Sequence, residues 1–381
     1  MNKIPLFKPY LSSSELSNVK NVFDSIWLGM GKNTFDFEKK IKSILNLDNR
    51  YVLSCNTGFS ALHLALISLN LKSNHEIIIP SFSNVANLQT ILNLNLRPVF
   101  CDVEDGSLCI DTNKLELKIN KNTKAIMFID YACNLADYKK IKKIANKYDL
   151  KVIHDAAHSF GSKYDNKNIG NIFDYTMFSF DPIKTITSID GGALVLKNKK
   201  IFTILKRVRN MGITEDNSFL KNKRSKKRDV MNIGLRYHLS NVNASVGISQ
   251  LNKFNKISSS RIKAVKSYLK YLSKNNFIRI PNLKENIVPF IFYIRVDKTH
   301  REKLMEFLSL NKIETGIHWR PLHTLYISKN LEKKDLEITN KIAKQIITLP
   351  LYPDISNKEI KYICSKILSY CEKYIDKPFN K

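Results

Sequence analysis

The chain has 381 residues, 43% of them hydrophobic and 10% aromatic, so it exceeds one small module and is not a disordered polymer. Its 62 Lys and Arg against 34 Asp and Glu give a net charge of +28, which admits nucleic acid, anionic lipid or an acidic small molecule as partners. Only twelve of these cations are arginines, whose bidentate geometry suits phosphate recognition, so we interpret most of the charge as solvated surface. The densest basic run, residues 221–228, is either a solvated loop or a loop that steers an anionic ligand.

Six cysteines are spread along the chain without a CxxC pair or a Cys/His ligand spacing. We therefore expect free thiols in a reducing compartment and no metal site. The first residues lack the apolar segment of a signal peptide, and no apolar run approaches the ~20 residues of a membrane span. These features predict a soluble cytoplasmic protein.

Short β-rich runs alternate with helical patterns through the first 250 residues, which predicts a layered α/β sheet. The first helix is predicted over residues 12–23, where Ser12 and Glu15 offer a capping box. Further helices are predicted over residues 35–47, 60–69 and 136–148. Strands are predicted over residues 51–55, 76–80, 97–102, 124–129, 151–155, 175–180 and 192–196.

A long helical pattern over residues 240–271 is predicted to cross into a second, smaller α/β unit. That unit is expected to contain strands over residues 287–296 and 312–319 and a final helix over residues 358–374. We therefore predict a large domain over residues 1–250 and a small domain over residues 251–381.

Three polar side chains lie at the end of a predicted strand, just after it or between two strands, in positions suited to chemistry. Asp155 ends a buried strand, where ligands of open α/β sheets gather, and His158 follows it after one turn of chain. Lys184 lies between two apolar strands, and a desolvated lysine has a lowered pKa and reacts as an amine nucleophile toward a carbonyl. Each residue also has a structural interpretation, Asp155 as a helix cap and His158 as a satisfied buried group.

The turn after the first strand offers an anion site. Gly58 and Phe59 would place backbone N–H groups at a helix N-terminus, and Ser179 could add a hydroxyl. The turn is neither a Walker loop nor a GxGxxG motif, which disfavours nucleoside triphosphates and dinucleotides. A phosphate seat, a carboxylate and a buried lysine together suit a phosphorylated pyridine aldehyde.

These residues lie in a set of motifs that resembles a known family. The chain is similar to the sugar aminotransferases of the DegT/DnrJ/EryC1/StrS family, which are pyridoxal-phosphate (PLP) enzymes of the aspartate-aminotransferase fold type, fold type I. The most specific stretches are residues 58–65, 80–82, 98–103, 155–161 and 179–184. The resemblance implies a large mixed-sheet α/β domain that binds the cofactor and a smaller C-terminal α/β domain.

The resemblance also implies a role for individual residues. Lys184 would hold PLP covalently and, once freed, shuttle a proton, while Asp155 would pair with the pyridinium nitrogen. His158 would hydrogen-bond the phenolic oxygen of the ring. The cofactor phosphate would be held by the amides of Gly58 and Phe59 and the hydroxyl of Ser179.

Three positions depart from the family pattern. Phe59 stands where threonine is usual, and Asn84 stands where an aromatic residue commonly stacks on the cofactor. Arg236 replaces an asparagine that reaches across the dimer to the phosphate. Residues 316–323 fall where family members line the substrate side of the pocket, although an edge strand and a turn would give the same pattern. Substrate-binding candidates there are His318, Arg320 and His323.

The implied function is transfer of an amino group from L-glutamate to a nucleotide-linked keto-deoxy sugar, with a 4-keto-6-deoxy sugar favoured, for surface glycan biosynthesis. A homodimer with shared active sites is expected, with neither nucleic acid nor membrane as partner. Alternatives are a 3-keto-sugar aminotransferase and a PLP-dependent sugar dehydratase, although the dehydratases replace the lysine with histidine. A basic protein that binds nucleic acid or lipid is the remote alternative.

Overall fold

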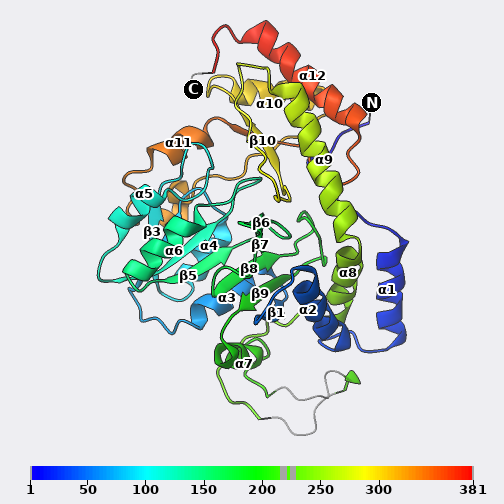
Figure 1. Ribbon diagram of the computed structural model, residues 1–381, viewed down its shortest axis with the longest axis vertical. Helices are drawn as coiled ribbons and strands as arrows, with labels where there is room; N and C mark the ends of the chain where they lie inside the picture. Colours follow the sequence, from blue (N-terminus) through cyan, green and yellow to red (C-terminus); the bar gives the residue numbers. More distant parts are fainter. Residues whose placement is uncertain (1, 215–220, 224–228, 380–381) are drawn as a thin grey trace.

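The computed structural model describes residues 2–214, 221–223 and 229–379 as alternating strands and helices (Figure 1). The strands are β1 (Tyr51–Cys55), β2 (Glu76–Pro80), β3 (Arg97–Cys101), β4 (Thr123–Ile129), β5 (Lys151–Asp155), β6 (Lys163–Tyr164), β7 (Lys167–Asn168), β8 (Tyr175–Ser179), β9 (Gly192–Leu196), β10 (Phe292–Arg295) and β11 (Ile346–Leu349). The helices are α1 (Ser13–Asp24), α2 (Lys32–Ile44), α3 (Gly58–Ile67), α4 (Val85–Leu92), α5 (Thr112–Leu115), α6 (Tyr138–Lys147), α7 (Lys199–Val208), α8 (Asn241–Asn252), α9 (Phe254–Leu272), α10 (Arg301–Leu310), α11 (Glu337–Ala343) and α12 (Asn357–Tyr374).

The main sheet has seven strands in the order β1-β9-β8-β5-β4-β2-β3. Neighbouring strands are parallel except around β9, which runs antiparallel to both β1 and β8. The carboxyl ends of the other strands therefore meet the start of β9 at one edge, where Gly192 pairs with both Cys55 and Ser179. Ligands of α/β sheets bind at this kind of edge.

Strand β4 shows how both faces of the sheet are buried. Ile126 and Phe128 point to the face covered by α2 and α6, whereas Ala125 and Met127 point to the face covered by α3 and α4. This alternation has the two-residue period of a strand. The strand is apolar throughout because helices exclude water from both of its sides.

Two helix predictions have different outcomes. The cap of α1 is confirmed, because the carboxylate of Glu15 accepts a hydrogen bond from the Ser12 N–H at 2.9 Å. The helical pattern predicted over residues 240–271 is observed, but as two helices. Lys253, with φ −99° and ψ 5°, ends α8 and precedes α9, so the apolar pattern continues through a break in the backbone.

The smaller unit is built on the antiparallel pair β10–β11, packed against α9, α10 and α12 (Figure 1). The strand predicted over residues 287–296 is confined to β10, because the segment before it turns inward and the Phe290 N–H bonds to the Ala132 carbonyl at 3.3 Å. The strand predicted over residues 312–319 is wrong, since Ile313 and Gly316 make isolated bridges to Ile4 and Thr348.

The division into residues 1–250 and 251–381 remains a prediction, and the buried clusters cross it at several points. Ile4 packs in the core of the smaller unit, which also contains Ala264 and Val265 of α9. Leu322 and Leu336 instead pack against the main sheet. Helix α9 contributes to both cores and runs from α8 toward α12 (Figure 1).

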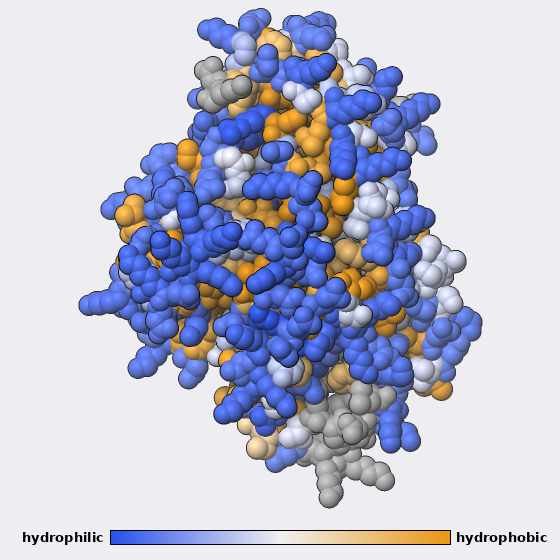
Figure 2. All heavy atoms as spheres, in the orientation of Figure 1, coloured by the Kyte–Doolittle hydropathy of each residue, from blue (hydrophilic) through white to orange (hydrophobic). Residues whose placement is uncertain are grey.

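Hydrophilic residues spread over the viewed face of the molecule instead of gathering on one part of it (Figure 2). Within the described ranges, no helix is long and apolar enough to span a bilayer. The basic run predicted as a loop lies partly outside the described residues, since only residues 221–223 of it are described.

Candidate active site

A cavity of about 260 Å³ opens at the carboxyl edge of the main sheet. The strand ends of β5 and β8 and the N-terminus of α3 form its walls, together with the loop between β8 and β9 and residue Trp319. Seven of the residues singled out in the sequence line this one cavity. They are Gly58, Phe59, Asn84, Asp155, His158, Ser179 and Lys184.

The predicted phosphate site, called the anion seat below, consists of Gly58, Phe59 and Ser179 and lies where three chain segments approach closely. Thr57 caps α3 by accepting a hydrogen bond from the Ser60 N–H at 3.0 Å, which leaves the first-turn amides of the helix directed at the cavity end. A Cβ on Gly58 would lie 3.0 Å from Ser179 Cβ, and one on Gly192 would lie 2.3 Å from the Thr57 carbonyl oxygen. Glycine at both positions therefore lets a hydroxyl and a helix N-terminus share one anion site.

Asp155 is a buried carboxylate at the end of β5, with 2% of its surface exposed. Its Oδ1 accepts a hydrogen bond from the Ala157 N–H at 3.0 Å. Burial raises the pKa of Asp155 to about 6, while the Ala157 hydrogen bond, the charge of Lys184 and the side chain of Asn87 oppose the rise. A carboxylate in this environment favours a cationic partner such as a protonated ring nitrogen.

Asn87 was not identified in the sequence. It is fully buried on α4, where its Nδ2 donates to Ser83 Oγ at 2.8 Å and its side chain also reaches Asp155. A polar residue on the buried face of an amphipathic helix is the signal that could have found it.

His158 presents an unpaired donor to the site. Its Nδ1 accepts a hydrogen bond from the Ala132 N–H at 3.2 Å, which puts the proton of the neutral ring on Nε2. Burial lowers the pKa of His158 well below its ordinary value, and the charges of Lys184 and His318 add to this effect. Nε2 is buried without a hydrogen-bond partner in the described structure. It is therefore free to donate to an oxygen of a bound ring.

Lys184 lies in the loop between β8 and β9, where its backbone N–H bonds to the Asp181 carbonyl at 3.0 Å. Its Nζ lies 4.4 Å from the centre of the Phe290 ring. Burial lowers the pKa of Lys184, although Asp155 and Asp181 partly counteract this. A lowered pKa increases the fraction of free amine, which is the form that attacks a carbonyl.

These groups fit PLP, which carries a phosphate, a ring nitrogen, a phenolic oxygen and an aldehyde. The anion seat, Asp155, the Nε2 of His158 and the Nζ of Lys184 match those four features in turn. When bound, PLP withdraws electrons from the carbon that carries an amino group and so makes proton transfer there possible. No group of three or more metal-ligating side chains occurs in the described part of the chain.

The three positions that depart from the family pattern differ in their placement. Phe59 and Asn84 line the cavity, but the Asn84 side chain caps α4 by accepting from the Ala86 N–H at 2.9 Å. Arg236 is exposed and does not line the cavity of its own chain; its backbone bridges to Asn210.

The segment of residues 316–323 contributes differently from what the sequence predicts. Trp319, which was not singled out, lines the cavity and stacks on His158 with ring centres 4.9 Å apart. Its aromatic side chain within a motif already placed at the substrate side was the available signal. His318 lies behind it, where Nδ1 contacts Thr348 Oγ1 at 3.0 Å and burial, with the charge of Lys184, lowers the pKa to about 4.

None of the three candidates in this segment, His318 included, lines the cavity. Arg320 is exposed and bonds to the side chain and carbonyl of Thr324. His323 is buried, with Nδ1 2.7 Å from Ser81 Oγ and Nε2 3.1 Å from Asn340 Oδ1. Both ring nitrogens of His323 are thus used within the protein.

Comparison with known proteins agrees with the PLP chemistry that the cavity residues indicate. A profile of the DegT/DnrJ/EryC1/StrS aminotransferase family matches residues 9–368. The GDP-perosamine synthase of Vibrio cholerae is 30% identical over 377 residues, covering 96% of this chain and 99% of that protein.

Solved structures agree with this match. PseC, a Helicobacter pylori aminotransferase involved in the biosynthesis of pseudoaminic acid, superposes with a TM-score of 0.92 at 25% identity, covering 98% of this chain and 100% of PseC. The PLP form of the putative sugar aminotransferase Spr1654 from Streptococcus pneumoniae gives a TM-score of 0.90 at 23% identity, covering 97% and 99%. The chain therefore belongs to the DegT/DnrJ/EryC1/StrS aminotransferase family, with the fold type I architecture and PLP dependence of that family.

Proposed function

We propose that the protein transfers an amino group from L-glutamate to a nucleotide-linked keto sugar, with a 4-keto-6-deoxy sugar as acceptor. The observation that carries this proposal is the convergence of Lys184, Asp155 and the α3 anion seat on one cavity. The names of the relatives supply the substrate class, since they include a GDP-perosamine synthase and an aminotransferase of pseudoaminic acid biosynthesis. Surface glycan biosynthesis in the cytoplasm is the setting that this chemistry suggests.

Each residue has a defined task in the proposed reaction. The anion seat and Asp155 would hold the phosphate and the ring nitrogen of PLP, and the Nε2 of His158 would donate a hydrogen bond to the ring oxygen. Lys184 Nζ would hold the cofactor covalently and, once free, would remove the proton from the glutamate Cα, where PLP would supply the electron withdrawal. In the second half of the reaction, Lys184 delivers a proton to the sugar carbon that receives the amino group.

The substrate side is proposed to be formed by Trp319 and the exposed Arg320. Trp319 offers an aromatic surface beside His158, and the Arg320 guanidinium can bind a diphosphate. His318 supports the wall behind Trp319, and we assign His323 a structural role because both of its ring nitrogens are bonded.

A homodimer with shared active sites forms part of the proposal. Arg236 is exposed and absent from its own cavity wall, which is the placement expected of a residue that reaches the phosphate of a second copy. Residues 221–223 precede this segment, and Asn222 Oδ1 accepts a hydrogen bond from the Lys32 N–H at 3.0 Å. The sugar dehydratase alternative is disfavoured by a lysine at position 184.

The test is incubation of the purified protein with L-glutamate and a panel of 4-keto and 3-keto nucleotide sugars, followed by mass spectrometry and NMR. The proposal predicts an amino sugar with the new amine at C4 and one 2-oxoglutarate formed for each product. Amination at C3 would favour the 3-keto alternative. Loss of water from the sugar without consumption of glutamate would indicate a dehydratase and refute the proposal.

A further inference from the structure

The amine of Lys184 has an aromatic neighbour that the proposed reaction does not use. Its Nζ lies 4.4 Å from the centre of the Phe290 ring, a distance at which an ammonium is attracted to the ring face. Within the described residues, Lys184 makes no ion pair or side-chain hydrogen bond, although the charges of Asp155 and Asp181 act on it. The face of Phe290 is thus the direct contact of the free ammonium.

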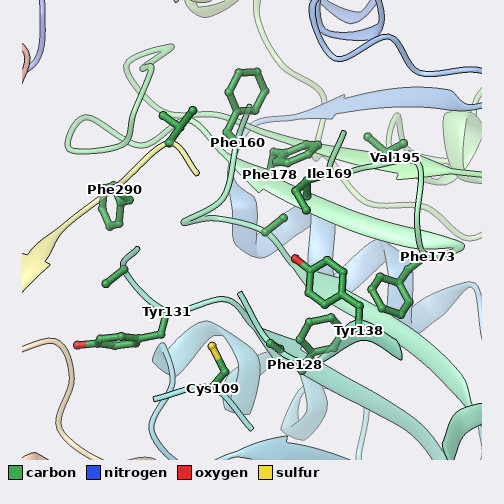
Figure 3. Close-up of a cluster of buried hydrophobic side chains, with 14 of the residues drawn as sticks. Cys109, Phe128, Tyr131, Tyr138, Phe160, Ile169, Phe173, Phe178, Val195 and Phe290 are labelled. Carbon is green, nitrogen blue, oxygen red and sulfur yellow. The ribbon is translucent and has the colours of Figure 1, made fainter. Parts of the chain in front are cut away.

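Phe290 is held rigidly from several sides. Its side chain is 1% exposed, it packs on His158 with ring centres 4.3 Å apart, and Phe7 stacks on it at 6.0 Å. Its carbonyl accepts a hydrogen bond from the buried Arg261 of α9 at 2.9 Å. Figure 3 shows Phe290 on the segment that leads into β10, and its ring packs in the same buried cluster as Phe128 and Phe178 of the main sheet.

We propose that Phe290 is a positioning residue whose ring face binds the ammonium of Lys184, the form that the lysine has at rest in the cofactor-free protein and after it has accepted a proton in the reaction. The inference rests on the proposed role of Lys184 as the amine that takes up PLP. The ring would keep the freed side chain inside the cavity and close to the position from which it must accept and return a proton. It would also set the pH at which the resting ammonium becomes a nucleophile.

Four titratable groups face Lys184 and act on it together with the ring. Asp155 and Asp181 favour the ammonium, whereas protonation of His158 or His318 would oppose it. Burial lowers the pKa of both histidines, which favours their neutral forms. Because Phe290 also packs on His158 at 4.3 Å, Phe290→Tyr, which keeps the ring, is the comparison that isolates the ring face.

The test uses cofactor-free protein and the covalent capture of PLP across a pH series, trapped with cyanoborohydride and located by peptide mass spectrometry. Phe290→Met keeps an apolar side chain but removes the ring, so the ammonium loses its attraction and the capture profile moves down by about one pH unit. Phe290→Tyr retains the ring face and should keep the wild-type profile. Phe7→Leu is the matched control, because it removes the neighbouring ring that does not touch Lys184.

The outcomes separate this inference from the proposed function. If wild-type protein does not label Lys184, the proposed function fails. If Lys184 is labelled and the Phe290→Met profile coincides with that of the wild type, only the role of Phe290 is refuted. The role of Phe290 would also be refuted if the capture profile of Phe290→Tyr or Phe7→Leu shifted as far as that of Phe290→Met. Circular dichroism checks that each variant folds. If Phe290→Met does not fold, Phe290→Leu is used in its place.

Discussion

Replacing Asp155 by asparagine tests the claim that this buried carboxylate is kept for the cofactor and not for stability. Burial raises the pKa of Asp155 from 3.8 to about 6. The unfolded chain therefore ionises at lower pH than the folded chain, and the cofactor-free protein loses stability as the pH rises from 3.8 through 6. An asparagine side chain cannot ionise, so Asp155→Asn should stabilise the cofactor-free protein at neutral and alkaline pH.

The magnitude follows from the size of the shift. A shift of about two units at ~1.4 kcal/mol per unit corresponds to roughly 3 kcal/mol of unfolding free energy at pH 8. At pH 5 the folded carboxylate is mostly protonated while the unfolded one is mostly ionised, so about half of that gain remains. The asparagine side chain can still accept the Ala157 hydrogen bond, which leaves the local backbone unchanged.

Urea unfolding of cofactor-free wild type and Asp155→Asn at pH 8 and pH 5 measures this difference. Asp24→Asn is the control, because Asp24 is exposed and its loss should have no comparable effect at either pH. With PLP present, Asp155→Asn should lose aminotransferase activity by ~10²-fold or more. An Asp155→Asn protein that is less stable than wild type at pH 8, or a difference that does not depend on pH, would refute the reasoning.

Four further substitutions probe the rest of the site. Lys184→Ala should abolish the borohydride-reducible absorbance of the purified protein and lower activity by ~10³-fold or more; an unchanged band would contradict its role. Gly192→Ala places a Cβ 2.3 Å from the Thr57 carbonyl oxygen, so it should weaken PLP binding in a cofactor titration and cost about 1–3 kcal/mol of stability, and unaltered affinity would exclude the proposed seat. His323→Ala should lower the unfolding free energy by about 1–3 kcal/mol without raising the KM for the sugar. Trp319→Ala, by contrast, should raise that KM. A raised KM in His323→Ala with an unchanged KM in Trp319→Ala would show that His323 binds the sugar.

The strands of the main sheet could be predicted because each is a short apolar run that ends at a polar or turn residue. Asp155 and Ser179 end two such strands, and parallel strands bring their carboxyl ends to one edge, so the sequence order already placed these side chains together. The antiparallel direction of β9 was not predicted. It is made possible by the loop of residues 180–191, which carries Lys184 and connects β8 to its neighbour β9 at the same edge of the sheet.

The parts of the site that the sequence did not reveal come from segments that fold back across the cavity. Phe290 and Trp319 reach Lys184 and His158 from the C-terminal part of the chain, and of the two only Trp319 lies in a motif that the sequence places at the substrate side. The apolar alternation of residues 312–319 resembles a strand, but isolated bridges to Ile4 and Thr348 take the place of a ladder. The placement of these two aromatic rings and the loss of the predicted strand both depend on tertiary packing, which the spacing of apolar residues along the sequence does not encode.

The measurement that tests the account most directly is the half-reaction of PLP-loaded protein with L-glutamate in the absence of a sugar. The account predicts one equivalent of 2-oxoglutarate per chain, a matching loss of the reducible absorbance, and recovery of that absorbance when a 4-keto nucleotide sugar is added. Lys184→Ala should give none of these changes. Turnover by Lys184→Ala at the wild-type rate, or failure of the wild-type protein to form 2-oxoglutarate, would contradict the assignment of Lys184 and the proposed amino donor.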